Sequence, residues 1–170
     1  MIAIIGAGKM GEALLAGMLA KDHAPNDVLV TEPREEHAAE LRSRYGVETV
    51  PAEEAAKRAD LLLLALKPHD MPALLQQIGH HLSANTLVVS VAAGLTTEAL
   101  ESHLPVSVPV VRAMPNTPAL VGEGMTAVAG GSHTGPEHLD RAEQILGTVG
   151  EVLRIEERHM DTVTAISGSG

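Results

Sequence analysis

Short apolar runs recur along the chain and are separated by longer segments in which polar and apolar residues are mixed. Each run is bounded by polar or turn-forming residues and is short for a helix, so a strand is expected at each. The predicted strands are 2–5, 28–31, 48–50, 61–65, 87–91, 108–111, 124–129 and 150–155.

The segments between these runs mostly have the spacing of helices. In 11–21 and 35–45, apolar residues recur at intervals that put them on one helical face. Segment 136–148 begins with Pro136, and proline is favoured at the first position of a helix. Strands and helices therefore alternate, which is the pattern of a βαβ series.

The strands of this series lack the polar alternation of a half-exposed sheet. The runs LLLLA at 61–65 and LVVSV at 87–91 are almost wholly apolar, which is typical of strands covered on both faces. This pattern predicts an α/β fold with a doubly wound, mostly parallel sheet and helices on both faces. The Pro/Gly-rich loop 112–124 is the longest linker, so we predict one domain over residues 1–165.

Composition narrows the possible partners. Phe, Trp and Cys are absent and Tyr45 is the only aromatic residue, so the core is aliphatic and disulfides are excluded. A net charge of −10, with 12 scattered Lys and Arg residues, argues against nucleic acid. No apolar run reaches membrane-spanning length, and the start of the chain lacks the pattern of a secretory signal. We therefore expect a cytoplasmic protein with no membrane partner.

The histidines and serines do not suggest a metal or a nucleophile. None of the nine His residues has H-E-x-x-H spacing or a third ligand nearby, so surface positions are expected and no metal is predicted. His69 is the one histidine close to a predicted binding edge. Ser167 and Ser169 lack a nearby base in sequence, so donation of hydrogen bonds to a ligand is favoured over nucleophilic attack.

A glycine motif joins the first predicted strand to the first predicted helix. Residues 6–11, GAGKMG, fit G-x-G-x-x-G, with Gly6 at the turn, Gly8 at the approach of a phosphate and Gly11 at the helix–strand contact. A structural turn is the alternative. The position between strand and helix favours a dinucleotide, because the helix offers free N–H groups to the pyrophosphate. The fold predicted is therefore of the Rossmann type.

Two residues after the second strand give opposite indications of the cofactor. Glu32 lies 21 residues after Gly11, where a carboxylate accepts from the ribose hydroxyls of NAD. Arg34 could instead pair with the 2′-phosphate of NADP. A solvated Glu–Arg surface is the alternative interpretation.

Three further stretches follow predicted strands, where open α/β sheets bind their ligands. They are ALKPHD at 65–70, VSVAAG at 89–94 and RAMPNTPALVGEG at 112–124. In the last, Asn116 and Thr117 offer amide and hydroxyl groups between two prolines. Each stretch alone could be an ordinary loop, but all are expected at one edge of the sheet.

These motifs together resemble the pyrroline-5-carboxylate reductase family over the whole chain. The resemblance is carried by IGAGKMGEALLAGML, ALKP, VSVAAG, RAMPNTPALVGEGMTA and DTVTAISGSG, in the order and spacing of that family. It implies hydride transfer from NAD(P)H to the C=N carbon of 1-pyrroline-5-carboxylate, which yields L-proline. NADPH is the expected cofactor, with NADH possible.

The resemblance also implies roles for individual residues. Residues expected to bind the cofactor, including the pair Glu32 and Arg34 argued above, are Gly6, Ala7, Gly8, Lys9, Met10, Gly11, Glu32, Arg34, Ala65, Leu66, Lys67, Pro68, Ala92, Ala93, Met114, Pro115 and Asn116. Candidates on the substrate side, which offer hydroxyl, amide or backbone N–H groups, are Asn116, Thr117, Ser167, Gly168 and Ser169.

Members of that family continue past SGSG into a helical domain that forms a homodimer and helps to hold the substrate. We therefore expect residues 166–170 to begin the connection to such a domain, and this chain alone to be the cofactor-binding part of the enzyme. Two alternatives remain: a non-catalytic NAD(P)-sensing module, and another imine or hydroxyacid dehydrogenase of the same superfamily.

Overall fold

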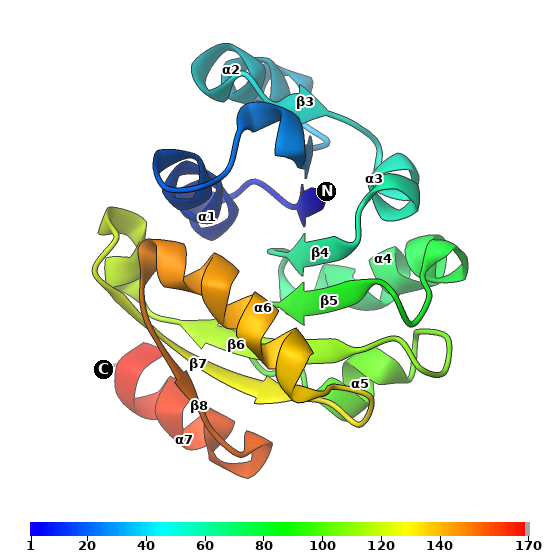
Figure 1. Cartoon of the computed structure of the whole chain (residues 1–170), viewed down its shortest axis with the longest axis vertical. Coiled ribbons are helices and arrows are strands. Elements are labelled where there is room, and N and C mark those ends of the chain that lie inside the picture. The colour runs from blue at the N-terminus through cyan, green and yellow to red at the C-terminus, as the bar shows by residue number, and fades with distance from the viewer. Residues whose placement is uncertain (169–170) are drawn as a thin grey trace.

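The structure is a computed structural model that describes residues 1–168. Its centre is a sheet of eight strands in the order β3-β2-β1-β4-β5-β6-β7-β8 (Figure 1). The strands are β1 (Ile2–Ile5), β2 (Val28–Thr31), β3 (Glu48–Thr49), β4 (Leu61–Leu64), β5 (Leu87–Ser90), β6 (Val110–Pro115), β7 (Gly124–Gly130) and β8 (Gly150–Arg154). Every predicted strand is present, with small differences at the ends.

The sheet is mostly parallel, as predicted. Among residues 1–168 only the pair β6–β7 is antiparallel, and β8 then pairs with β7 in parallel. The order of the first six strands, 3-2-1-4-5-6, is that of a Rossmann fold. Its switch point lies at β1, which has β2 on one side and β4 on the other.

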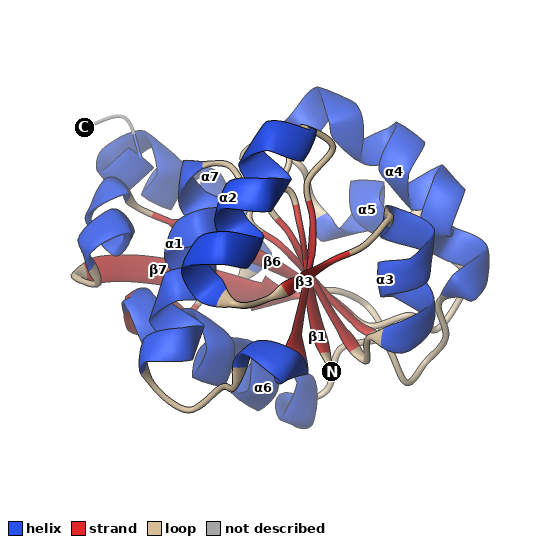
Figure 2. Ribbon diagram, turned by 90° about the horizontal axis from the view of Figure 1, so that it is seen from above, coloured by secondary structure: helices blue, strands red, loops and turns tan. Residues whose placement is uncertain are grey.

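Helices cover both faces of the sheet (Figure 2). They are α1 (Lys9–Ala20), α2 (Glu35–Tyr45), α3 (Ala52–Arg58), α4 (Met71–Ile78), α5 (Thr97–Glu101), α6 (Pro136–Leu146) and α7 (Met160–Val163). Helices α1, α2 and α6 bury aliphatic side chains against one face, and α3, α4 and α5 against the other. The buried residues of both cores are aliphatic, as the composition predicts, and Tyr45 packs partly buried against the first.

Three boundaries differ from the prediction. Helix α1 begins at Lys9 instead of residue 11, because Gly8 already caps it. Helix α6 begins at Pro136 as predicted but ends at Leu146, where the chain tightens into a 3₁₀ turn. The predicted loop 112–124 is partly regular: its first residues extend β6, and Thr117–Val121 form a 3₁₀ helix.

A buried arginine explains why part of that loop is a strand. Arg112, on β6, is only 2% exposed. Its Nη2 lies 2.7 Å from Oδ1 of Asp161 and its Nη1 lies 3.5 Å from Oε1 of Glu157. Glu157 also accepts a hydrogen bond of 2.7 Å from the backbone N–H of Thr97. The sheet, α5 and the segment that leads into α7 are thereby joined around one charge.

Candidate functional site

The loops that follow the parallel strands meet at one edge of the sheet. Residue Ile5 at the end of β1 is in register with Thr31 of β2 and Leu64 of β4, and Leu64 is in register with Ser90 of β5. Strands β4, β5 and β6 all point to this side of the molecule (Figure 1). The four stretches singled out from the sequence therefore lie along one edge, here called the binding edge.

Two glycines of the loop after β1 are required by close packing. Gly6 has φ +94°, and a Cβ there would lie 2.7 Å from the carbonyl oxygen of Ala65. At Gly11, a Cβ would lie 2.1 Å from the carbonyl oxygen of Gly6. Since both contacts are with backbone, neither neighbour can move aside, and the loop after β1 packs directly on the start of the loop after β4.

Gly8 differs from its neighbours because the space around it is open. A Cβ at Gly8 would meet no atom within 4 Å, and the residue is exposed. It is the N-cap of α1 and supplies no side-chain cap, while its carbonyl accepts the first helical hydrogen bond from Glu12. Residues Lys9, Met10 and Gly11 form the first turn, whose N–H groups have no acceptor within the helix. This arrangement can bind an anion such as a phosphate.

Glu32 and Arg34 bind each other. Arg34 Nε lies 2.9 Å from Oε1 of Glu32, Arg34 Nη2 lies 3.2 Å from Oε2, and the backbone N–H of Arg34 also donates to Oε1. The hydrogen bonds from Arg34 hold the pKa of Glu32 below its ordinary value, although burial acts in the opposite direction. The Glu32 side chain is 3% exposed and that of Arg34 is 68% exposed, so the arginine is free to turn outward.

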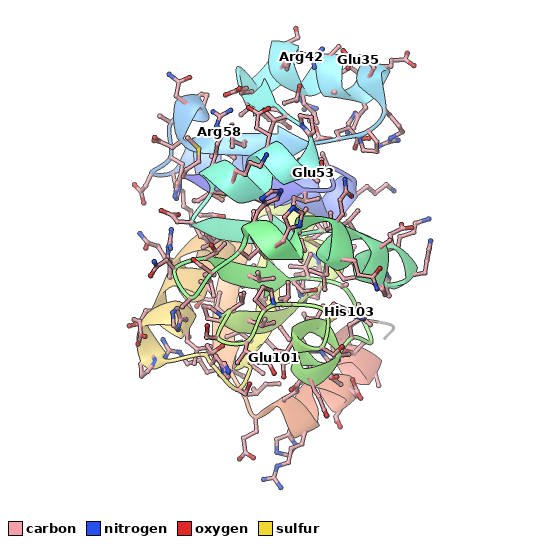
Figure 3. The ribbon with its side chains drawn as sticks, turned by 90° about the vertical axis from the view of Figure 1, so that its right-hand side faces the viewer. Glu35, Arg42, Glu53, Arg58, Glu101 and His103 are labelled. Atoms are coloured by element: carbon pink, nitrogen blue, oxygen red, sulfur yellow. The ribbon has the colours of Figure 1, made fainter. Side chains whose placement is uncertain are left out.

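A cleft of about 510 Å³ opens beside Glu32. Its walls come from the loops after β1, β2, β3 and β4 and from α2, α3 and α4, and Glu35 and Glu53 on two of its borders are labelled in Figure 3. Pro33, Ala38, Pro51 and Leu66 give it apolar surfaces, and Thr49 and Gln77 add polar groups. Apolar walls with a few polar groups suit a flat heterocycle. No sequence motif predicts this cleft, because its walls come together only through the strand order.

The predicted residues after β4 and β5 take different environments. Leu66 lines the cleft, whereas Lys67 and Pro68 are exposed at the start of a 3₁₀ turn. Ala92 is buried and its N–H lies 3.3 Å from Oγ of Ser90, and Ala93 is exposed. Small side chains after β5 leave the binding edge open at this point.

The end of β6 is held by an asparagine. Asn116 Oδ1 accepts a hydrogen bond of 2.8 Å from the backbone N–H of Met125, at the start of β7. Its amide nitrogen can still donate to a ligand, and Thr117 beside it is exposed. Met114 packs partly against the small core under α7, and Pro115 is buried.

The hydroxyl group of Ser167, a substrate-side candidate near the end of the chain, bonds within its own turn instead of contacting another candidate. Ser167 donates to the carbonyl of Val163 within its own helical turn, at 2.8 Å. Gly168 closes the same turn, Thr164–Gly168, which continues α7. Ser169 lies outside the described residues.

One residue that contacts the glycine loop, His37, could not be predicted from the sequence. His37 on α2 places Nε2 2.8 Å from the carbonyl oxygen of Ala7. The two residues are thirty positions apart, and no motif connects them. Only the packing of α2 beside the start of α1 shows the contact.

Residues 1–168 hold neither a metal-binding cluster nor a membrane-spanning helix. They contain no group of three or more His, Asp or Glu side chains arranged to hold a metal ion. No helix among them is both long and apolar enough to cross a bilayer.

Known proteins resemble this chain along its whole length. A pyrroline-5-carboxylate reductase of Corynebacterium melassecola is 43% identical over 172 residues, which cover 99% of this chain and 64% of that protein. The structure of a pyrroline-5-carboxylate reductase from Coxiella burnetii has a TM-score of 0.95 at 32% identity and covers 99% of this chain and 64% of the other. A Plasmodium falciparum pyrroline carboxylate reductase with NADP bound has a TM-score of 0.86 at 27% identity and covers 98% and 61%. The chain thus spans less than two thirds of these relatives.

A broader family covers the first half of the molecule. Residues 1–94, of 170, match the family described as NADP oxidoreductase, coenzyme F420-dependent. The matched part runs from β1 to the loop after β5 and includes the glycine loop and the Glu32–Arg34 pair. By this match the chain belongs to the NADP oxidoreductase, coenzyme F420-dependent, family.

Proposed function

We propose that this chain is the cofactor-binding part of a pyrroline-5-carboxylate reductase, which reduces 1-pyrroline-5-carboxylate to L-proline with NADPH or NADH. The observation that carries the proposal is the match of reductases of that name to 99% of the chain, at 43% identity in one case. The open space at Gly8, at the N-terminus of α1 and beside an apolar cleft, supports a dinucleotide independently.

The residues of the binding edge divide the work of holding the cofactor. The N–H groups at the start of α1 bind the pyrophosphate, and the cleft beside Glu32 takes the adenosine. Ala65, Leu66, Lys67 and Pro68 are assigned to the nicotinamide-ribose side, and Leu66 also lines the adenosine cleft. Ala92, Ala93, Met114, Pro115 and Asn116 wall the nicotinamide.

The bound cofactor supplies a hydride for the C=N carbon of the imine. A protonated imine is already electrophilic, so the protein has to align the two partners and exclude water. Asn116 and Thr117 are the substrate-side groups at the binding edge, and Ser167, Gly168 and Ser169 are further candidates. We propose that 166–170 lead into the part of the reductases that lies beyond this match, where substrate contacts and a homodimer interface are completed.

The cofactor is proposed to be NADPH in preference to NADH. Arg34 supports this choice because its exposed guanidinium can turn from Glu32 to a 2′-phosphate. NADH remains compatible, because Glu32 can accept from the ribose hydroxyls once Arg34 turns away from it.

The test is turnover by a version of the chain extended by the residues that follow this region in the reductases. We expect NADPH oxidation with 1-pyrroline-5-carboxylate and formation of proline, and no oxidation with hydroxy acids. Dinucleotide binding without turnover of any imine or hydroxy acid by the extended protein would favour the sensing module instead.

A further inference from the structure

The glycine loop is tied to α2 by a histidine that faces hydrogen-bond acceptors on both sides. His37 Nε2 lies 2.8 Å from the carbonyl oxygen of Ala7, and Nδ1 lies 3.3 Å from Oε2 of Glu40. We propose that His37 is a positioning residue that holds this loop as an imidazolium, so that binding of a pyridine dinucleotide is coupled to uptake of a proton. The inference rests on the proposed dinucleotide site.

The two hydrogen-bond partners of His37 determine which of its ring nitrogens carry protons. A carbonyl oxygen and an ionised carboxylate can only accept hydrogen bonds. Nε2 must therefore carry a proton to bond Ala7, and Nδ1 must carry one to bond Glu40. A neutral imidazole satisfies one of these partners, whereas the imidazolium satisfies both.

Charged side chains from neighbouring elements surround the His37 ring. From α1, Glu12 places Oε2 3.9 Å from His37 Nε2, while its other oxygen accepts from Arg44 and from the Tyr45 hydroxyl. From α2 itself, the Glu40 carboxylate faces Nδ1.

Before α2, Glu32 and Arg34 have opposite effects on the ring and are paired with each other. The carboxylates near the ring, Glu12, Glu32 and Glu40, outnumber the cations Arg34 and Arg44. The Ala7 carbonyl and Glu40 raise the pKa of His37 above its ordinary value, with partial burial acting against them.

The Ala7 carbonyl links His37 to the proposed dinucleotide site. Ala7 lies between Gly6 and Gly8, so the carbonyl that His37 holds belongs to the loop whose next residues form the first turn of α1. A diphosphate bound at that turn brings negative charge near the ring and favours its charged form. Binding therefore takes up a proton wherever the free protein is partly neutral at His37.

The consequence is tighter binding at lower pH. A single charge near a phosphate on a partly exposed surface is worth about a fivefold change in Kd. We expect the Kd for NADH to rise by about fivefold between pH 6 and pH 9 as the imidazolium is lost. NADH is the right probe because its diphosphate does not titrate in this range, whereas the 2′-phosphate of NADPH does.

The experiment measures NADH binding by fluorescence at several pH values in three proteins. In His37→Gln the amide can still donate to Ala7 but cannot be charged, so its Kd is expected to stay flat near the wild-type value at pH 9. His133→Gln is the matched control, because His133 is exposed in the turn after β7 at the opposite edge of the sheet, and it should follow the wild type. The same pH dependence in His37→Gln and the wild type would overturn the inference.

A second measurement does not need the variant to fold. Nitrogen NMR of wild-type His37 should show both ring nitrogens protonated near neutral pH, and NADH should shift the titration of the ring upward. Calorimetry in buffers of different ionisation enthalpy, at a pH where the free ring is partly neutral, should show proton uptake on binding. A neutral ring or an unchanged titration would contradict the inference while leaving the dinucleotide site intact. No NADH binding at any pH would instead contradict the proposed function.

Discussion

The atoms nearest to each glycine of the motif after β1 determine which substitutions that position tolerates. Gly11 has a backbone oxygen 2.1 Å from the position of its missing Cβ, whereas Gly8 has nothing within 4 Å. The same motif therefore contains one position that serves packing and another that leaves room for a ligand. Substitution at the two positions should separate folding from binding.

We expect Gly8→Val to fold and to lose dinucleotide binding. The φ of Gly8 is −68°, which valine adopts readily, and its side chain would fill the space above the first turn of α1. Calorimetric titration should show Kd values for NADPH and NADH weakened at least about tenfold, with thermal unfolding nearly unchanged. Gly11→Ala is the contrasting variant and should lose about 1–3 kcal/mol of stability from overpacking. Undiminished affinity in folded Gly8→Val would make the loop only a turn.

A second residue-scale prediction concerns the Glu32–Arg34 pair. Arg34→Ala should weaken NADPH binding by about tenfold and leave NADH nearly unchanged, because only the 2′-phosphate needs the guanidinium. Glu32→Ala serves as the reciprocal variant and should weaken NADH more than NADPH. Titration of both cofactors against both variants checks this. A wild type that prefers NADH, with no effect of Arg34→Ala on NADPH, would reverse the assignment.

At the scale of elements, the buried arginine of β6 connects parts that are distant in sequence. Glu157 contacts both Arg112 and Thr97, and its side chain is 27% exposed. Asp161, the other partner of Arg112, is 83% exposed. A carboxylate shielded from water is worth more to a buried cation than one surrounded by it.

Glu157→Gln should therefore destabilise the fold more than Asp161→Asn. We expect the first to cost about 1–3 kcal/mol, because the buried Arg112 and the Thr97 hydroxyl, which donates to Oε2 of Glu157, lose an ionised acceptor. The second should cost less than about 1 kcal/mol. Urea unfolding at neutral pH measures both. Equal costs would mean that exposure does not reduce the contribution of Asp161, which would contradict this prediction.

The elements also show which features the sequence could predict. Strands β1, β4 and β5 could be predicted because uninterrupted apolar runs are typical of strands buried on both faces. The end of β6 could not be predicted, because a charged residue such as Arg112 is typical of a loop. Its burial depends on Glu157 and Asp161, some fifty positions later in the chain. Among site residues, the glycine loop followed from its motif, whereas His37 and the cleft beside Glu32 depend on contacts between distant segments.

At the scale of the whole molecule, the proposed division of labour predicts what this chain does alone. It should bind NADPH or NADH weakly to moderately, because the binding edge is complete from Gly6 to Asn116. It should show no measurable reduction of 1-pyrroline-5-carboxylate, because alignment and exclusion of water contribute several kcal/mol to the barrier. A steady-state assay beside the extended version decides this. Comparable turnover by the short chain would place all catalytic groups within residues 1–170.

The single antiparallel pair, β6–β7, determines how the molecule can be labelled. Strands β7 and β8 run away from the binding edge, and the chain then returns through α7, so that the turn Thr164–Gly168 lies on the side to which β4 and β5 point (Figures 1 and 2). Met1 instead precedes β1, and its amine lies 3.5 Å from Asp60 at the opposite edge. A dye or affinity handle fused after residue 168 would therefore stand at the mouth of the site, and one fused before Met1 would leave it clear.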